Sequence, residues 1–168
     1  MTEPRFPHLT DTGEARMVDV SAKATTARTA TAAGLVRVNA DCVAALRSGS
    51  VPKGDALAVA RIAGIMAAKK TPDLIPLCHP LFLSGVDVVA EVVDDGVALR
   101  ATVTTNERTG VEMEALTAVA VAGLAVIDMI KAIDRAATIT DVRVLAKSGG
   151  RSGNWSRPGE GPGSEVGE

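Results

Sequence analysis

The sequence predicts an α+β fold, and three observations support this prediction. Segments with strand and helix character follow one another in the order β-α-β-β-α-β once one short helix is set aside. The chain has 168 residues, enough for one domain with a sizeable core and short for two. Hydrophobic residues make up 46% of the chain but aromatic residues only 2%, so Ala, Val, Leu and Ile must form the core. This order of elements is that of the ferredoxin-like plan, an antiparallel sheet with both helices on one face.

The first half of the domain is expected to hold a strand and two helices. Residues 29–38 have strand character and end in the apolar run LVRV. Asn39 can cap a short helix over residues 40–47, which is the extra helix of the predicted plan. Residues 55–70 form a stronger helical pattern, with basic residues in the last turn and Pro72 as the stop signal.

The second half is expected to hold a hairpin, a long helix and a last strand. Residues 84–93 and 97–105 are rich in Val and Thr around the turn signal DDG, which predicts a hairpin. Thr109 and Glu112 have the spacing of a capping box and are expected to open a helix that runs to about residue 131. Residues 138–146, TITDVRVLA, alternate as a half-buried strand should.

The two ends of the chain differ in composition from the rest. Residues 1–16 are polar and are predicted to form a flexible arm, and residues 151–168 a disordered tail rich in Gly, Ser and Pro. Residues 17–150 are then a single domain. The arm has no apolar core and does not resemble a secretory signal.

Charge and cysteine content exclude several classes of function. The net charge is −2, and with so few aromatic side chains the chain offers neither a basic field nor a stacking platform for nucleic acid. An anionic ligand must therefore be held by a local cluster of cations. Two separated cysteines do not form a disulfide framework, and too few ligands stand at close spacing for a zinc or other metal site. The longest apolar run, residues 115–127, is short for a bilayer, so we expect a cytoplasmic protein without membrane contact.

The stretch LIPLCHP places Cys78 beside His79 between Pro76 and Pro80. The prolines fix φ and remove two backbone donors, so the segment is expected to run extended toward the hairpin. In one interpretation His79 is a neutral core histidine and Cys78 a small hydrophobic residue. In the other, the segment is the rigid wall of a pocket whose imidazole donates or carries a proton.

Three other sets of charged residues have both structural and functional interpretations. Asp128 and Lys131 form either a surface pair or part of a lined cavity, since the residues around them, AVIDMIKAI, are apolar. Lys53 lies in a Pro–Gly turn and is either solvent-exposed or has its pKa lowered at a helix N-terminus. Lys147 and Arg151 lie in AKSGGRSG, which lacks the Walker order and is more typical of a fraying tail than of a phosphate nest.

Together these segments resemble one family. The blocks MVDVSAKATTARTA, KGDALAVARIAGIMAAKKTPDLIPLCHPL, TGVEMEALTAVAVAGL, DMIKAIDR and VLAKSGG are similar to those of the cyclic pyranopterin monophosphate synthase family, the accessory protein C of molybdenum cofactor biosynthesis. The resemblance covers about residues 17–150. It implies conversion of a cyclised dihydroguanosine triphosphate into cyclic pyranopterin monophosphate and diphosphate. It also implies that no redox cofactor and no metal-bound catalytic water take part.

The resemblance also implies roles for particular residues. It implies Asp128 as a catalytic aspartate and Lys53 and Lys131 as acid–base lysines. It implies that Arg28 and Lys147 are basic residues near the phosphates. The remaining substrate contacts that it implies are Leu77, Cys78, His79, Glu112, Met113 and Glu114.

Two other interpretations remain open, and the long predicted helix bears on assembly. Ferredoxin-like domains can be small-molecule-binding regulatory modules without catalysis, because fold alone does not determine function. A catalytically dead member of the family would have lost a key side chain, and none is missing. Glu114 and Asp128 are 14 positions apart, about 21 Å along a helix. We therefore expect sites shared across the dimer interfaces of a homo-oligomer, and the resemblance implies a hexamer built as a trimer of dimers.

Overall fold

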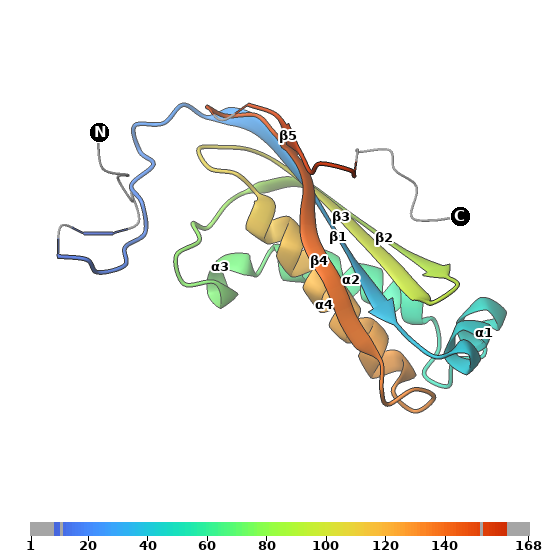
Figure 1. Cartoon of the computed structure of the whole chain (residues 1–168). Helices are drawn as coiled ribbons and strands as arrows, with labels where there is room; N and C mark the ends of the chain where they lie inside the picture. The colour runs from blue at the N-terminus through green and yellow to red at the C-terminus, as the bar shows by residue number, and fades with distance from the viewer. Residues whose placement is uncertain (1–8, 11, 152, 161–168) are drawn as a thin grey trace.

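A computed structural model of the chain describes residues 9–10, 12–151 and 153–160. It holds an antiparallel sheet in the order β2-β3-β1-β4-β5, with α2 and α4 on one face (Figure 1). The order β2-β3-β1-β4 confirms the predicted ferredoxin-like fold. The elements are β1 (Thr26–Arg37), α1 (Ala40–Ser48), α2 (Ala56–Ala68), α3 (Thr71–Leu74), β2 (Leu83–Val93), β3 (Gly96–Glu107), α4 (Glu112–Ile130), β4 (Thr138–Ser148) and β5 (Trp155–Ser156).

Strand β1 lies at the centre of the sheet. It pairs antiparallel with β3 along its full length and with β4 on the other side. β2 and β3 form the predicted hairpin. The register along β1 and β4 brings Thr29 opposite Ser148, so the beginning of one strand lies beside the end of the other. Residues distant in the sequence therefore meet at this end of the sheet.

Small side chains bring the two main helices close together. Ala60 and Gly64 of α2 and Ala118 and Ala122 of α4 are all buried. A Cβ added to Gly64 would lie 2.9 Å from the carbonyl oxygen of Ala118. The aromatic-poor composition thus suits the structure, because small residues let the helix backbones approach closely and pack at high density.

Helix starts agree with the sequence in two places and differ in a third. The Asn39 side chain accepts a hydrogen bond from the backbone N–H of Cys42, as expected of an N-cap, and Asp55 caps α2 in the same way. The predicted capping box is wrong. α4 begins at Glu112 with Val111 as the N-cap residue, which offers no side-chain bond. The Glu112 carboxylate instead accepts a hydrogen bond from the Lys147 ammonium at 2.8 Å, so it forms an ion pair with β4 rather than a capping contact.

The apolar run in α4 is longer than the sequence suggested. α4 has 19 residues, and by length and composition alone it is long and apolar enough to cross a membrane. Half of this stretch is buried inside the fold, where α4 packs against β1, β3, β4 and α2. Its hydrophobicity is therefore that of a core helix under a sheet.

Part of the expected disordered tail is ordered in the structure. β5 pairs antiparallel with β4, with Lys147 opposite Trp155 and Ala146 opposite Ser156. The physical reason is the free edge of β4, whose backbone groups need partners. Residues 161–168 of the expected tail and residues 1–8 of the expected arm lie outside the described residues.

Candidate active site

A cavity of about 860 Å³ lies at the end of the sheet where β1 and α4 begin. β4 and the segment before β2 also contribute to its lining. The structure brings eight of the predicted site residues together in this lining: Arg28, Leu77, Cys78, His79, Glu112, Met113, Glu114 and Lys147.

The Leu-Cys-His segment forms one wall of the cavity. The Cys78 backbone N–H donates to the Ile75 carbonyl at 3.0 Å, which closes a turn, and the chain then runs without regular structure to β2. His79 Nε2 lies 2.7 Å from the Val18 carbonyl oxygen. Because a carbonyl can only accept, Nε2 carries the hydrogen, and Nδ1 is the ring nitrogen left free of this contact. This hydrogen bond to the Val18 carbonyl fixes the imidazole at the cavity wall.

The Cys78 side chain does not have the surroundings of a nucleophile. Burial raises the pKa of its thiol, and the negative charge of Glu114 raises it further. A reactive cysteine needs an electropositive environment that favours the thiolate. The thiol therefore stays protonated and acts as an apolar part of the wall.

Two carboxylates stand in the first turn of α4 and differ in their surroundings. Glu112 pairs with Lys147. Glu114 is buried, with 3% of its surface exposed. Burial raises the pKa of Glu114, its own backbone N–H opposes this, and the neighbouring charge of Glu112 adds to the rise. A carboxyl group with a raised pKa in a cavity is suited to giving or taking a proton.

Several cations also line the cavity. The Arg28 guanidinium is braced by two carbonyls after the end of β3, with Nε 2.9 Å from the Glu107 oxygen and Nη2 3.1 Å from the Arg108 oxygen. The predicted local cluster of cations is thus present in a chain of net charge −2. Two further charged lining residues, Lys23 and Arg108, were not among the predicted candidates, and Arg151, which the sequence left between a fraying tail and a phosphate nest, also lines the cavity. Lys23 lies in the block MVDVSAK, and its position there was the available signal.

The three predicted catalytic residues form a second cluster. Lys53 Nζ donates to Asp128 Oδ2 at 2.9 Å and to the Asp128 carbonyl at 2.8 Å, and Lys131 Nζ donates to Oδ1 at 2.8 Å. The hydrogen bonds from Lys131 and then Lys53 hold the pKa of Asp128 at about 2. Asp128 is therefore ionised at neutral pH and can orient two ammonium groups.

This geometry bears on the two interpretations of Lys53. The sequence left the residue either solvent-exposed or influenced by the N-terminus of α2, where its turn lies, and the side chain is 43% exposed. The side chain instead reaches the last turns of α4 and hydrogen-bonds a carbonyl there. The C-terminal end of a helix carries partial negative charge and favours a cation, so the relevant dipole has the opposite sign.

The two clusters lie at opposite ends of α4. The cavity surrounds its first turn, and the Lys53–Asp128–Lys131 cluster lies at its last turns, about 21 Å away along the axis. Within one chain the structure does not bring them together. Among the described residues, no group of three or more His, Cys, Asp and Glu side chains could hold a metal ion.

Comparison with known proteins places the chain in a family. The model of the MoaC family matches residues 17–150. The chain belongs to the MoaC family. The matched region contains β1 to β4 and both clusters of charged residues, whereas β5 lies beyond it.

Several curated MoaC relatives carry the same name. A protein from a Nocardioides species is 65% identical over 157 residues, covering 92% of this chain and 96% of the relative. One from Streptomyces avermitilis is 64% identical over 155 residues, covering 92% and 91%. Both are named cyclic pyranopterin monophosphate synthase. A third, from Mycobacterium tuberculosis, is 59% identical over 150 residues, covers 89% and 90%, and is named cyclic pyranopterin monophosphate synthase 2.

Proposed function

We propose that this MoaC chain is a lyase, a cyclic pyranopterin monophosphate synthase of molybdenum cofactor biosynthesis. It converts a cyclised dihydroguanosine triphosphate into cyclic pyranopterin monophosphate and diphosphate. The observation that carries the proposal is a cavity with cations and carboxylates on a chain that also holds an ionised aspartate between two lysines. The names of the curated relatives support it.

The cavity suits a substrate with a charged end and a polar ring. Arg28 and Lys147 are proposed to bind the phosphates and to stabilise the charge of the departing diphosphate, as preorganised cations do. Arg28 is already held by two carbonyls, so little reorganisation is needed. The wall against the ring is proposed to consist of Leu77, Cys78, His79 and Met113, and Glu112 and Glu114 are proposed to contact polar atoms of the ring.

The Lys53–Asp128–Lys131 cluster is proposed to move protons. Rearrangement of the ring system requires proton transfer at nitrogen and hydroxyl groups, and a lysine Nζ can both give and take a proton. Asp128 stays ionised, since its pKa is about 2, and positions both ammonium groups through its two carboxylate oxygens.

A complete site is proposed to need two chains. The cavity and the lysine cluster are about 21 Å apart along one helix, too far for a compact site. Two chains related by a twofold axis, with their α4 helices antiparallel, would bring the first turn of one beside the last turn of the other. We propose a homohexamer built as a trimer of dimers, with sites at the dimer interfaces. Both described cysteines are free, which suits the reducing conditions of the cytoplasm.

The test is a reaction with one defined substrate. The purified chain is incubated with the cyclised dihydroguanosine triphosphate, and pyranopterin and diphosphate are measured separately. Formation of both in equal amounts supports the proposal, and a Lys131→Arg variant is the negative control. Binding of the triphosphate without turnover is the result expected of a regulatory domain, and it would overturn the proposed synthase activity.

A further inference from the structure

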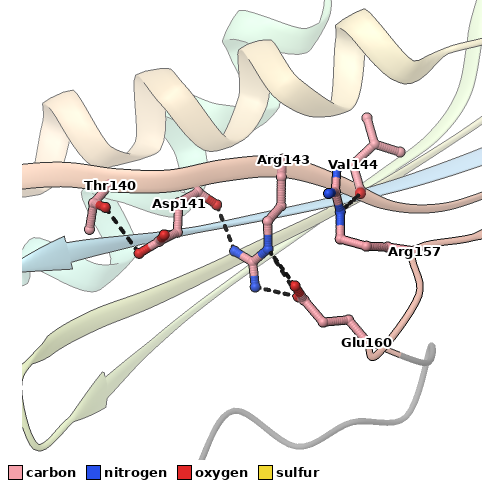
Figure 2. Close-up of polar contacts among 6 residues, drawn as sticks. All are labelled: Thr140, Asp141, Arg143, Val144, Arg157 and Glu160. Carbon is pink, nitrogen blue, oxygen red and sulfur yellow. Dashed lines mark hydrogen bonds and ion pairs between the residues drawn. The ribbon is translucent and has the colours of Figure 1, made fainter.

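The chain turns back on itself after β4 and returns along the free edge of the sheet. Beyond the two paired residues of β5, the Arg157 backbone N–H donates to the Leu145 carbonyl at 2.7 Å. The Arg157 side chain continues the contact, since its Nε donates to the Val144 carbonyl at 2.7 Å (Figure 2). Residues 153–160 thus form a clasp on β4, the C-terminal clasp.

The far end of the clasp is held by an ion pair. Arg143 Nε lies 3.0 Å and 2.9 Å from the two carboxylate oxygens of Glu160, and Arg143 Nη2 also contacts this carboxylate (Figure 2). The side chains are only 31% and 33% exposed. The hydrogen bond from Arg143 holds the pKa of Glu160 below its ordinary value, so the carboxylate is charged at neutral pH. Because the donors of a planar guanidinium are fixed relative to one another, this contact orients the Glu160 carboxylate as well as attracting it.

A bulge in β4 presents Arg143 to the clasp. β4 has one more residue than β1 between the partners of Ala33 and Leu35, and Asp141 in this stretch has φ of 57°. An Asp tolerates this left-handed conformation better than most residues. The Asp141 carbonyl accepts a hydrogen bond from Arg143 Nη1 at 2.6 Å (Figure 2). Bulges commonly redirect a side chain in this way, and here the Asp141 carbonyl holds the guanidinium independently of Glu160.

The loop that the clasp closes lies on the rim of the cavity. Gly149 has φ of 89°, and a Cβ there would lie 2.1 Å from the Ala27 carbonyl oxygen. A Cβ on Gly150 would lie 2.2 Å from Nη1 of Arg28. The backbone therefore passes directly beside the Arg28 guanidinium, which only glycine allows. The next residue, Arg151, lines the cavity.

The clasp also shares a groove with the ion pair inside the site. A smaller groove of about 330 Å³ is lined by Glu112, Val144, Lys147 and Trp155. Trp155 therefore borders the Glu112–Lys147 pair, and it is opposite Lys147 in the β4–β5 register. The Arg157 guanidinium lies over the Trp155 ring, 5.7 Å from its centroid. The cation–π contact and the backbone pairing with β4 therefore both stabilise residues 155–157 of the clasp.

We propose that the C-terminal clasp positions Arg151 as an additional cation for the phosphates of the substrate, with Glu160 as the positioning residue that holds the clasp on Arg143. This inference rests on the proposed function of the cavity. Arg151 approaches from β4 on the side of Arg28 and Lys147, so the three cations can share the charge of a diphosphate group. A guanidinium suits this role, because its donors match phosphate oxygens two at a time.

Docking of the clasp is tested through the single tryptophan of the chain. Trp155 is the only Trp, and there is no Tyr, so intrinsic fluorescence reports on the clasp alone. Glu160→Gln is expected to raise the quenching of Trp155 by acrylamide and to speed tryptic cleavage after Arg151 about fivefold. The bond after Arg157 precedes a proline and is not a competing site. Asp95→Asn, which breaks the exposed Arg37–Asp95 pair, is the matched control and should change neither measurement.

The role of Arg151 is tested by kinetics and by a product probe. Arg151→Gln is expected to raise KM for the triphosphate about tenfold and to leave kcat within about twofold, because the catalytic lysines are untouched. Trp155 quenching should stay at the wild-type value. Inorganic diphosphate should protect the wild-type chain from cleavage after Arg151. Glu160→Gln should also raise KM, and Glu160→Asp, which keeps the carboxylate, should raise KM less.

Three outcomes would overturn the inference. One is unchanged Trp155 quenching in Glu160→Gln, which means that the ion pair does not hold the clasp. Another is increased quenching with an unchanged KM, which means that the clasp does not serve the cavity. The third is an unchanged KM in Arg151→Gln. If Arg28→Gln and Lys147→Gln still raise KM, the proposed phosphate site stands and the clasp alone fails. If Arg28→Gln and Lys147→Gln leave KM unchanged, the proposed function of the cavity fails.

Discussion

Glu114 and Asp128 stand in the first and the last turns of the same helix, and their surroundings shift their pKa values in opposite directions. Burial raises the pKa of Glu114, whereas Lys131 and Lys53 hold that of Asp128 at about 2. The first side chain is 3% exposed and belongs to the cavity, while the second is 57% exposed. Because the Lys53–Asp128–Lys131 cluster is exposed and lies far from the cavity of its own chain, the proposed catalytic role of the cluster requires a cavity from another chain.

Mixing of two inactive variants tests the shared site. Glu114→Ala disables the cavity of its chain, and Asp128→Ala disables the lysine cluster of its chain. In a mixed dimer one of the two sites combines an intact cavity with an intact cluster. Random association of equal amounts makes half of the dimers mixed, so we expect about a quarter of the wild-type activity.

The control for this experiment is a pair of variants with defects in the same cluster. Glu114→Ala mixed with Glu112→Ala leaves every cavity defective and should stay inactive. If the first mixture also stays inactive while native mass spectrometry shows mixed oligomers, each site belongs to one chain.

Substitution of the lysines by arginine tests proton transfer separately from charge. In Lys53→Arg or Lys131→Arg, the guanidinium can keep its ion pair with Asp128 but cannot deprotonate. We expect turnover to fall by about 10²- to 10⁴-fold in either variant with little change in KM. Lys70→Arg is the matched control, because Lys70 forms a similar i,i+3 pair with Asp73 on the surface. Wild-type turnover in Lys53→Arg would remove this residue from the acid–base role.

Replacement of the cavity thiol by a hydroxyl tests whether Cys78 forms a covalent bond. Burial raises the pKa of the thiol, so the group is a protonated part of the wall. We expect Cys78→Ser to keep activity within about tenfold of the wild type, since the loss is one of packing and polarity. Steady-state kinetics together with a measured substrate Kd give the answer. Complete inactivity with normal substrate binding would contradict the role of Cys78 as a wall.

The fold was largely predictable because its signals are local. Asn39 and Asp55 are N-caps with their acceptor in place, and the DDG turn and the alternating strands have short-range patterns. The capping box was wrong because the Glu112 carboxylate pairs with Lys147, on a strand 35 residues away. Local spacing carries no information about such a contact.

The separation of the candidate residues was predictable, because helix geometry alone places Glu114 and Asp128 about 21 Å apart. The structure has the two expected clusters at the ends of α4, but spacing along one helix does not show which side chains outside α4 join each cluster. The clasp was not predicted, and Arg151 was considered more typical of a fraying tail, for a different reason. A Gly- and Ser-rich composition predicts disorder on average, whereas Trp155 and Glu160 each find one specific partner on β4.

Glu114→Gln should lower activity and raise the free energy of unfolding, and the gain in stability should depend on pH. Below the ordinary pKa of 4.5 the carboxyl group is protonated in both the folded and the unfolded chain, and it makes no difference to stability. As the pH rises above 4.5, the unfolded chain ionises first, because burial holds the pKa of the folded state higher. The wild type therefore loses stability as the pH rises through the raised pKa, and Glu114→Gln does not. We expect the variant to be more stable at neutral pH, with the advantage vanishing below about pH 4.5.

Urea unfolding from about pH 4 to about pH 8 at fixed ionic strength measures this difference. Asp128→Asn provides the opposite sign, because the pKa of Asp128 is lowered to about 2 in the folded chain. The stability from its two lysine partners is present above the ordinary pKa of 3.8 and is lost as the pH falls toward 2, so Asp128→Asn should be the less stable chain at neutral pH. If Glu114→Gln unfolds at the same or a lower urea concentration than the wild type at pH 7, the folded chain does not disfavour ionisation of the Glu114 carboxyl group. The cavity would then need a partner for Glu114 that favours the charged form, and a cation from a neighbouring chain, such as Lys53 or Lys131, is the one that the shared site would supply.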